Sequence, residues 1–118
     1  MGQAFVNIVN ASYNLNLPDG LAYPIAVGIA AQQMEVDLRL TLQCYLQAFA
    51  ANLISVGVRS IPIGQQAGQK CLKTLGPIIK SMADTLSKGT LDDLGSGSFV
   101  SDIMAMQHEV STPRIYRT

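Results

Sequence analysis

The chain has 118 residues, enough for a single domain of modest size, and its eight basic and eight acidic residues cancel at neutral pH. This balance excludes a strong general attraction to nucleic acid or to an anionic membrane surface. Only 14% of the residues are charged while 48% are hydrophobic, and just four of the charged side chains lie before Arg59. We therefore expect part of the charge-poor first half to face other protein.

Helical periodicity and helix breakers alternate along the chain, and no alternating strand pattern interrupts them. The first predicted helix spans residues 2–13, and Pro18-Asp19-Gly20 marks the turn that follows it. A second helix is predicted to begin near Tyr23, with Pro24 in its first turn. Its small residues favour close packing inside the fold, with a subunit contact as the alternative.

A long central helix is predicted from an N-cap at Asp37 to about Ser60, before the breaker Pro62. Its uncharged residues 40–58 are just numerous enough to cross a bilayer. Two glutamines one turn apart lie behind a single apolar stripe, however, and this pattern favours a buried helix of a bundle. The stripe consists of Leu42, Tyr45, Leu46, Phe49, Leu53 and Val56. We expect no membrane span here.

The next helix is predicted to begin around Gly64, and Gly76-Pro77 must kink or divide it. Asp84 and Lys88 have the spacing of an i, i+4 ion pair. The predicted apolar face consists of Leu72, Leu75, Ile79, Met82 and Leu86.

A loop over residues 87–98 follows, with one helical turn at 90–94, and a short helix is predicted over 101–109 with Ser101 as its cap. Cys44 and Cys71 lie among helix-forming neighbours and are expected to be buried free thiols. Together these elements predict an all-α fold: a compact bundle of about five or six helices forming one domain over residues 1–118.

The stretch IPIGQQAGQKCL, residues 61–72, arranges glycines and a lysine almost as a phosphate-binding loop does. Three residues separate Gly64 from Gly68 where a phosphate-binding loop has four, Gln69 stands between Gly68 and Lys70, and Cys71 replaces the hydroxyl that would bind magnesium. The preceding segment is predicted to be helical, whereas a phosphate-binding loop follows a strand. These departures disfavour a nucleotide site.

Other catalytic signatures are weak. His108 is the single histidine, and with two separated cysteines the chain cannot supply an ordinary three- or four-ligand metal site. Met104 shares a helix face with His108, which favours packing over a soft metal contact. We therefore expect no enzyme and no cofactor, and we keep two alternatives: a generic helical oligomerisation module, and a nucleotide- or metal-binding enzyme that uses Lys70 or His108.

Three segments resemble one protein family. VRSIPIGQQAGQ, residues 58–69, resembles the central signature of the urease accessory protein UreF, and HEVSTPRIYRT, residues 108–118, resembles that family's C-terminal motif. PIAVGIAAQQ, residues 24–33, and YLQAFAANLISVGV, residues 45–58, are similar to its central helices. The resemblance places the chain as the C-terminal half of a typical member, expected from a piece of a longer protein or from a split gene.

The resemblance implies a cytoplasmic, dimerising, all-α protein that is not an enzyme. It implies a scaffold that binds the accessory protein UreD (UreH in some species) and recruits the GTPase UreG, so that nickel reaches apo-urease. Residues 110–118 would form a partner-binding tail, with His108 and Glu109 beginning the C-terminal motif. The residues implied to contact UreD/UreH are Arg114, Ile115, Tyr116 and Arg117. The signature residues implied to lie near the dimer core are Arg59, Pro62, Gly64, Gln65, Gly68 and Gln69.

Overall fold

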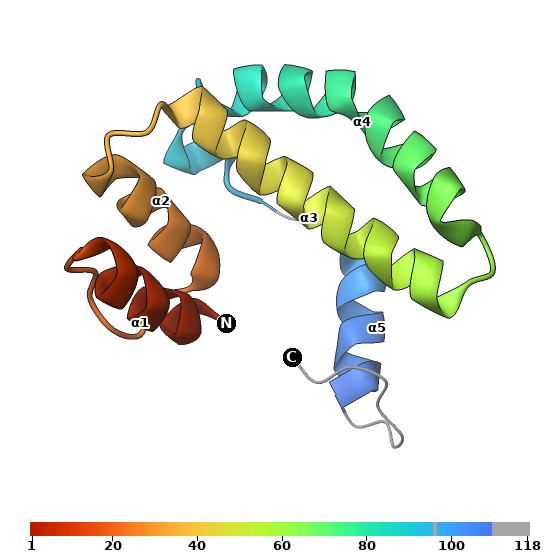
Figure 1. The fold of residues 1–118 in the computed structure, drawn as a ribbon, viewed down its shortest axis with the longest axis horizontal. Helices are drawn as coiled ribbons and strands as arrows, with labels where there is room; N and C mark the ends of the chain where they lie inside the picture. The colour runs from red at the N-terminus through yellow and green to blue at the C-terminus, as the bar shows by residue number, and fades with distance from the viewer. Residues whose placement is uncertain (96, 110–118) are drawn as a thin grey trace.

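The computed structural model describes residues 1–95 and 97–109, and in these ranges the chain is all-α, as the sequence predicts. Figure 1 shows the order of the helices along the chain. The elements are α1 (Gly2–Tyr13), α2 (Tyr23–Gln33), α3 (Leu38–Ser60), α4 (Gly64–Leu86), the 3-10 turn η1 (Leu91–Asp93) and α5 (Phe99–Glu109). The five α-helices of the described residues agree with the predicted number.

The first two helices form a hairpin whose connecting loop is held by side chains of α1. Asn10 donates from Nδ2 to the carbonyl of Leu17 at 3.0 Å and accepts from the N–H of Leu17 at 2.9 Å. About two turns before Asn10, Gln3 accepts from the N–H of Gly20 at 2.8 Å and donates to Asp19 at 2.6 Å. These bonds satisfy loop backbone groups and fix Leu17 over the hairpin.

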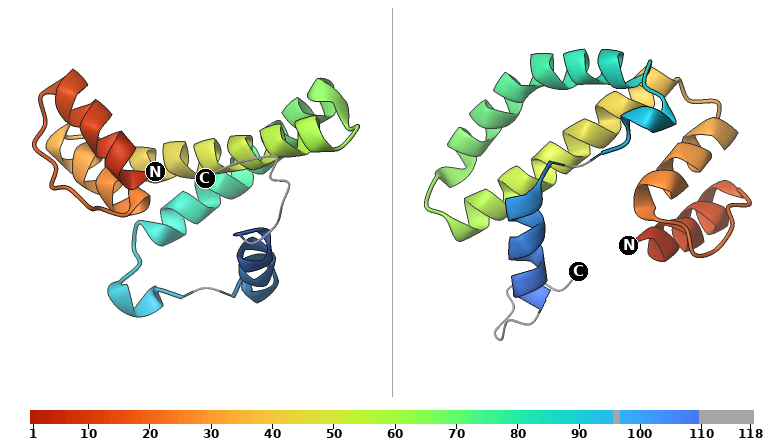
Figure 2. Two further views of the ribbon diagram at one scale, coloured as in Figure 1. Left: turned by 90° about the horizontal axis from the view of Figure 1, so that it is seen from below. Right: turned by 180° about the vertical axis from the view of Figure 1, so that it is seen from behind.

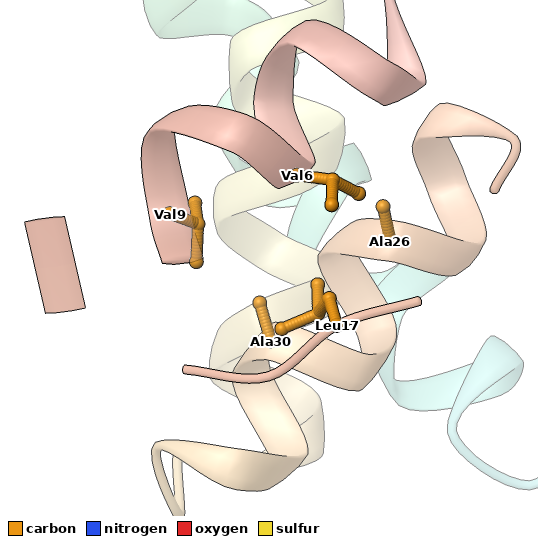
Figure 3. Close-up of a cluster of buried hydrophobic side chains, with 5 residues drawn as sticks. All are labelled: Val6, Val9, Leu17, Ala26 and Ala30. Atoms are coloured by element: carbon orange, nitrogen blue, oxygen red, sulfur yellow. The ribbon is translucent and has the colours of Figure 1, made fainter. Parts of the chain in front are cut away.

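Leu17 completes the small core between α1 and α2. The cluster consists of Val6, Val9, Leu17, Ala26 and Ala30, and their side chains converge from both helices and the loop (Figure 3). Alanine on α2 allows the two helices to lie close together, which confirms the predicted internal packing for Ala26 and Ala30. Gly28 is exposed and takes no part in this packing. An edge-on contact between the rings of Phe5 and Tyr23, with centroids 5.4 Å apart, extends this core toward α3.

The two longest helices, α3 and α4, run antiparallel as a second hairpin (Figures 1 and 2). Asp37 caps α3 as predicted, because its carboxylate accepts from the N–H of Leu40 at 2.9 Å. Pro77 lies inside α4 without dividing it, and Figure 1 shows the helix bowed along its length. The loss of one backbone donor is therefore absorbed by curvature.

The loop after α4 contains the predicted helical turn. Thr90 precedes η1, and Asp93 accepts from the Thr90 N–H at 2.8 Å and from its hydroxyl at 3.1 Å. The backbone bond first, and the hydroxyl second, hold the pKa of the Asp93 carboxyl below its ordinary value, since both stabilise the ionised form.

Helix α5 begins at Phe99, so the prediction that Ser101 caps it is wrong. The carbonyl of Ser98 already accepts from the N–H of Asp102 at 2.9 Å, which places Ser101 inside the first turn. Interhelical contacts among the described residues join α1 to α2, α2 to α3, and α3 to α4, so α5 packs against none of them. Figure 2 shows it standing apart from the α3–α4 hairpin.

Three local predictions are wrong for a common reason. Cys44 and Cys71 are exposed free thiols rather than buried ones. Asp84 pairs with Arg39 of α3 instead of Lys88. Helix α4 ends at Leu86, so Lys88 lies beyond it, whereas the last turns of α4 lie beside the start of α3. In each case the sequence spacing identifies the helix face but not the neighbour that lies against it.

The central helix shows the largest difference from expectation, because no residue of α3 is buried. Phe49 and Leu53 of the predicted apolar stripe are each 59% exposed. None of the helices described is both long and apolar enough to cross a membrane.

Candidate functional site

The segment that resembles the family signature forms the corner between α3 and α4. Ile61 follows α3 in an extended conformation, with its N–H bonded to the carbonyl of Gly57 at 2.8 Å. The N–H of Ile63 then bonds to the carbonyl of Ile61 at 2.8 Å. Gly64 opens α4 with φ of +69°, a left-handed conformation that costs a residue with a side chain about 1 kcal/mol or more. The glycine therefore makes the reversal of the chain possible.

A second glycine brings the two helices together just after the corner. Gly68 is buried, and a Cβ atom built there would lie 2.8 Å from Cγ2 of Val58 and 3.1 Å from Cγ2 of Ile54. Any larger residue would have to push α4 away from α3. The glycines of this signature thus have two distinct tasks, turning at position 64 and close packing at position 68.

The structure brings all six signature residues together at one end of the hairpin. Only Gly68 is buried; the side chains of the other residues are exposed, Arg59 in the last turn of α3 and the glutamines in the first turns of α4. The exposed members are Arg59, Pro62, Gly64, Gln65 and Gln69. Ile61 and Ile63 add apolar surface, with exposures of 54% and 47%. The corner is thus a surface of polar and apolar side chains at the end of two packed helices.

This geometry does not form a phosphate-binding loop. The segment before Gly64 is helix α3, and Gly68 and Lys70 already belong to α4. A phosphate-binding loop requires free backbone N–H groups wrapped around the anion, whereas the Gly68 N–H lies inside a helix and its Cα faces α3. The nucleotide-binding alternative therefore lacks its structural basis at this position.

A shallow groove of about 240 Å³ runs between α3 and α4, away from the corner. The residues that line it are Leu40, Gln43, Cys44, Gln47, Gly76, Ile79 and Lys80. Both glutamines predicted to lie behind the apolar stripe therefore face α4. In the part of the chain that the structure describes, no group of three or more histidine, cysteine, aspartate or glutamate residues is arranged to hold a metal ion.

The structure describes the backbone of only two of the predicted C-terminal residues. His108 and Glu109 occupy the end of α5. The predicted partner-binding tail, residues 110–118 with Arg114, Ile115, Tyr116 and Arg117, lies outside the described residues.

Sequence reasoning missed the contacts that hold α3 to its neighbours. Arg39 pairs with Asp84 across the α3–α4 hairpin, and the rings of Tyr23 and Tyr45 lie 6.0 Å apart between α2 and α3. Arg39 is the single basic side chain before Arg59 in the sequence. Its spacing of 45 residues from Asp84 gives no signal that would have identified that partner.

The sequence of the chain matches a known protein family. The model of the family described as UreF matches residues 1–76, which include α1, α2, α3, the corner and the first half of α4. No solved structure matches the chain significantly.

Three curated relatives extend the match to nearly the whole chain. The urease accessory protein UreF of Ruegeria pomeroyi is 41% identical over 99% of this chain and 54% of its own length. The same-named proteins of Roseobacter denitrificans and Rhodopseudomonas palustris are 42% and 34% identical over 99% of the chain, covering 52% and 51% of their own lengths. The chain thus spans about half the length of the curated relatives it matches. Its relatives are named as accessory proteins of urease rather than as enzymes. Since the family model covers more than half of the residues, the chain belongs to the UreF family of urease accessory proteins.

Proposed function

We propose that this chain acts in urease maturation as part of a scaffold that binds UreD/UreH and recruits the GTPase UreG, so that nickel reaches apo-urease. The observation that carries the proposal is the match to proteins named urease accessory protein UreF along 99% of the chain. Nickel is the cargo of this process, and no residue of the chain is assigned here as its ligand. The proposed compartment is the cytoplasm.

The corner between α3 and α4 supports a role in protein contact. It presents exposed isoleucines beside proline and two glutamines, and apolar side chains with a polar rim are typical of protein interfaces. The α3–α4 hairpin supports this surface from behind through the close approach at Gly68. We assign the corner to the neighbourhood of a homodimer core.

We assign the contact with UreD/UreH to the C-terminal tail. Arg114 and Arg117 flank Ile115 and Tyr116, and arginine and tyrosine are enriched among the residues that dominate binding energy at interfaces. A short segment of this composition can bury a tyrosine and an aliphatic side chain while its guanidinium groups pair with carboxylates at the rim.

The test is co-expression of the chain with tagged UreD/UreH of the same organism, followed by pull-down. The variant carries Arg114→Ala and Arg117→Ala, and the matched control carries Lys70→Ala and Lys73→Ala, which removes the same charge from exposed positions of α4. We expect UreD/UreH to retain at least tenfold less of the tail variant than of the unsubstituted chain, and to retain the control as well as the unsubstituted chain. Undiminished retention of the tail variant would refute the assignment.

The same control separates the proposal from the alternatives. Saturable, stoichiometric binding of GTP or Ni²⁺ to the purified chain, abolished by Lys70→Ala or by His108→Ala, would favour a nucleotide- or metal-binding enzyme. Self-association without retention by UreD/UreH would favour a generic oligomerisation module.

A further inference from the structure

The apolar stripe of α3 and the neighbouring Leu38 form one surface, which we call the α3 face. It consists of Leu38, Leu42, Tyr45, Leu46, Phe49, Leu53 and Val56. Leu42, Tyr45 and Leu46 of this face are half-buried, and its other residues are exposed. Four of these residues rank among the exposed large hydrophobic side chains, with Leu38 at 57%, Phe49 and Leu53 at 59% each, and Val56 at 38%. An apolar surface of this length on a soluble protein marks a site of contact.

Helix α4 does not cover the α3 face because it packs on the other side of α3. Ile54 and Val58 contact Gly68, and Gln43 and Gln47 line the groove toward α4. At 100° per residue these positions lie roughly 150° around the helix from the centre of the α3 face. The α3–α4 hairpin is therefore built on the more polar side of α3.

The other described helices leave the second half of the face open. Helix α2 reaches α3 near its beginning, where Tyr23 lies beside Tyr45, and α5 has no contact with α3. Phe49, Leu53 and Val56 lie beyond the reach of the α2 contact and remain exposed. Although α3 is 23 residues long, not one of its residues is buried.

The chemistry of the face defines what can cover it. From Leu40 to Val58 the helix carries no charge, so a covering segment finds no ion-pair partner and must bring apolar side chains. From Leu38 to Val56 the face extends about 27 Å at 1.5 Å per residue. This is the length of one amphipathic helix of about 18 residues with apolar positions at i, i+3, i+4 and i+7.

The relatives of this chain indicate where such a helix comes from. The described residues bury only seven hydrophobic side chains, divided between the two hairpins. The relatives that match along the whole of this chain are about twice as long. We propose that the α3 face packs against helices of the other half of a UreF-length protein, whether these lie on the same polypeptide or are supplied in trans. This inference rests on family membership and does not depend on the proposed contacts with UreD/UreH or UreG.

The test is co-expression of the 118-residue chain with a tagged polypeptide that comprises the part of Ruegeria pomeroyi UreF outside the match. The variant carries Phe49→Asp and Leu53→Asp on the α3 face. The matched control carries Phe99→Asp and Ile103→Asp on α5, an equally spaced aromatic and aliphatic pair with exposures of 72% and 54%. We expect the unsubstituted chain and the control to co-purify in a 1:1 complex and the α3 variant to lose at least 100-fold in affinity.

Two further measurements keep the outcome interpretable. Phe49→Ala/Leu53→Ala removes the contact without introducing charge, and circular dichroism checks that each variant retains its helices. Hydrogen exchange should slow in residues 45–58 when the two polypeptides associate, and not in α5.

Several results would overturn the proposal. One is the failure of the two polypeptides to co-purify, and another is a complex that survives the α3 substitutions. A third is a dimer of the unsubstituted chain alone that Phe49→Asp/Leu53→Asp converts to monomer, since a second copy would then be the occupant. Loss of binding in the α5 control only would assign the contact to α5 instead. Retention of the chain by UreD/UreH is measured in a separate experiment. The proposed UreD/UreH contact and the proposed packing of the α3 face can therefore fail independently.

Discussion

Replacing Gly68 with alanine tests how the α3–α4 hairpin is held together. The added Cβ would lie 2.8 Å from Cγ2 of Val58 and 3.1 Å from Cγ2 of Ile54, both closer than ordinary van der Waals contact. Valine and isoleucine in a helix have essentially one χ1 rotamer, so neither methyl group can rotate away. The strain must therefore be relieved by moving α4 away from α3.

Two opposing effects determine how much Gly68→Ala changes the free energy of unfolding. Overpacking of a well-packed contact costs about 1–3 kcal/mol. Alanine gains up to about 1 kcal/mol over glycine inside a helix. Since the steric cost is the larger, we expect Gly68→Ala to lower the free energy of unfolding by about 1 kcal/mol.

Urea denaturation followed by circular dichroism at 222 nm measures this change. The matched control is Gly28→Ala in α2, where no atom lies within 4 Å of the added Cβ, so only the helix-propensity gain of about 0.5–1 kcal/mol remains and the protein should become more stable. In a Val58→Ala background the cost of Gly68→Ala should fall, because the closest methyl group is gone. Equal stabilisation by both glycine substitutions would refute the close approach at position 68.

Two electrostatic contacts give further predictions. A double-mutant cycle of Arg39→Ala and Asp84→Ala should give a coupling of about 0.5 kcal/mol, because these side chains are 54% and 39% exposed and solvent screens the pair. The coupling should shrink in 1 M NaCl, and a salt-independent coupling above about 2 kcal/mol would contradict the exposed geometry. An NMR titration should place the pKa of Asp93 below its ordinary value, and Thr90→Ala should raise it while the backbone bond keeps it partly lowered. A carboxyl whose pKa is lowered by folding stabilises the fold above its unfolded pKa, and this stabilisation is lost as the pH falls through the folded pKa. The Asp93 contribution to any loss of stability in Thr90→Ala should therefore disappear at acid pH. An unchanged Asp93 pKa in the variant would count against the hydroxyl bond.

Local signals in the sequence were sufficient for the helices and for most of their ends. Asp37 caps α3 because its short carboxylate reaches a free backbone N–H three residues on, a contact that requires only neighbouring residues. Gly64 opens α4 because the chain must take a left-handed conformation there. Ser101 was misassigned as a cap for the same local reason, since Ser98 offers an equivalent serine one turn earlier.

The proximity of the predicted signature residues could be expected from the sequence, but the geometry of the corner could not. The family resemblance singled out the signature residues, and the structure brings them together because they are close in sequence around one corner. The turn at Gly64 and the close packing at Gly68 could both be expected from the sequence, but the atoms that Gly68 packs against could not, because Val58 and Ile54 lie on a different helix.

The sequence by itself determined the all-α class, most helix boundaries and the family, because capping, proline and glycine conformations and the 3.6-residue period act within a few residues of each position. Only the tertiary structure decided which side of each helix is covered. The apolar stripe of α3 predicted a buried helix, yet α4 packs on the side of Gln43 and Gln47 and leaves Phe49 and Leu53 exposed. Periodicity specifies a face that excludes water when a neighbour is present, but the identity of that neighbour is a long-range property that no spacing along the chain encodes.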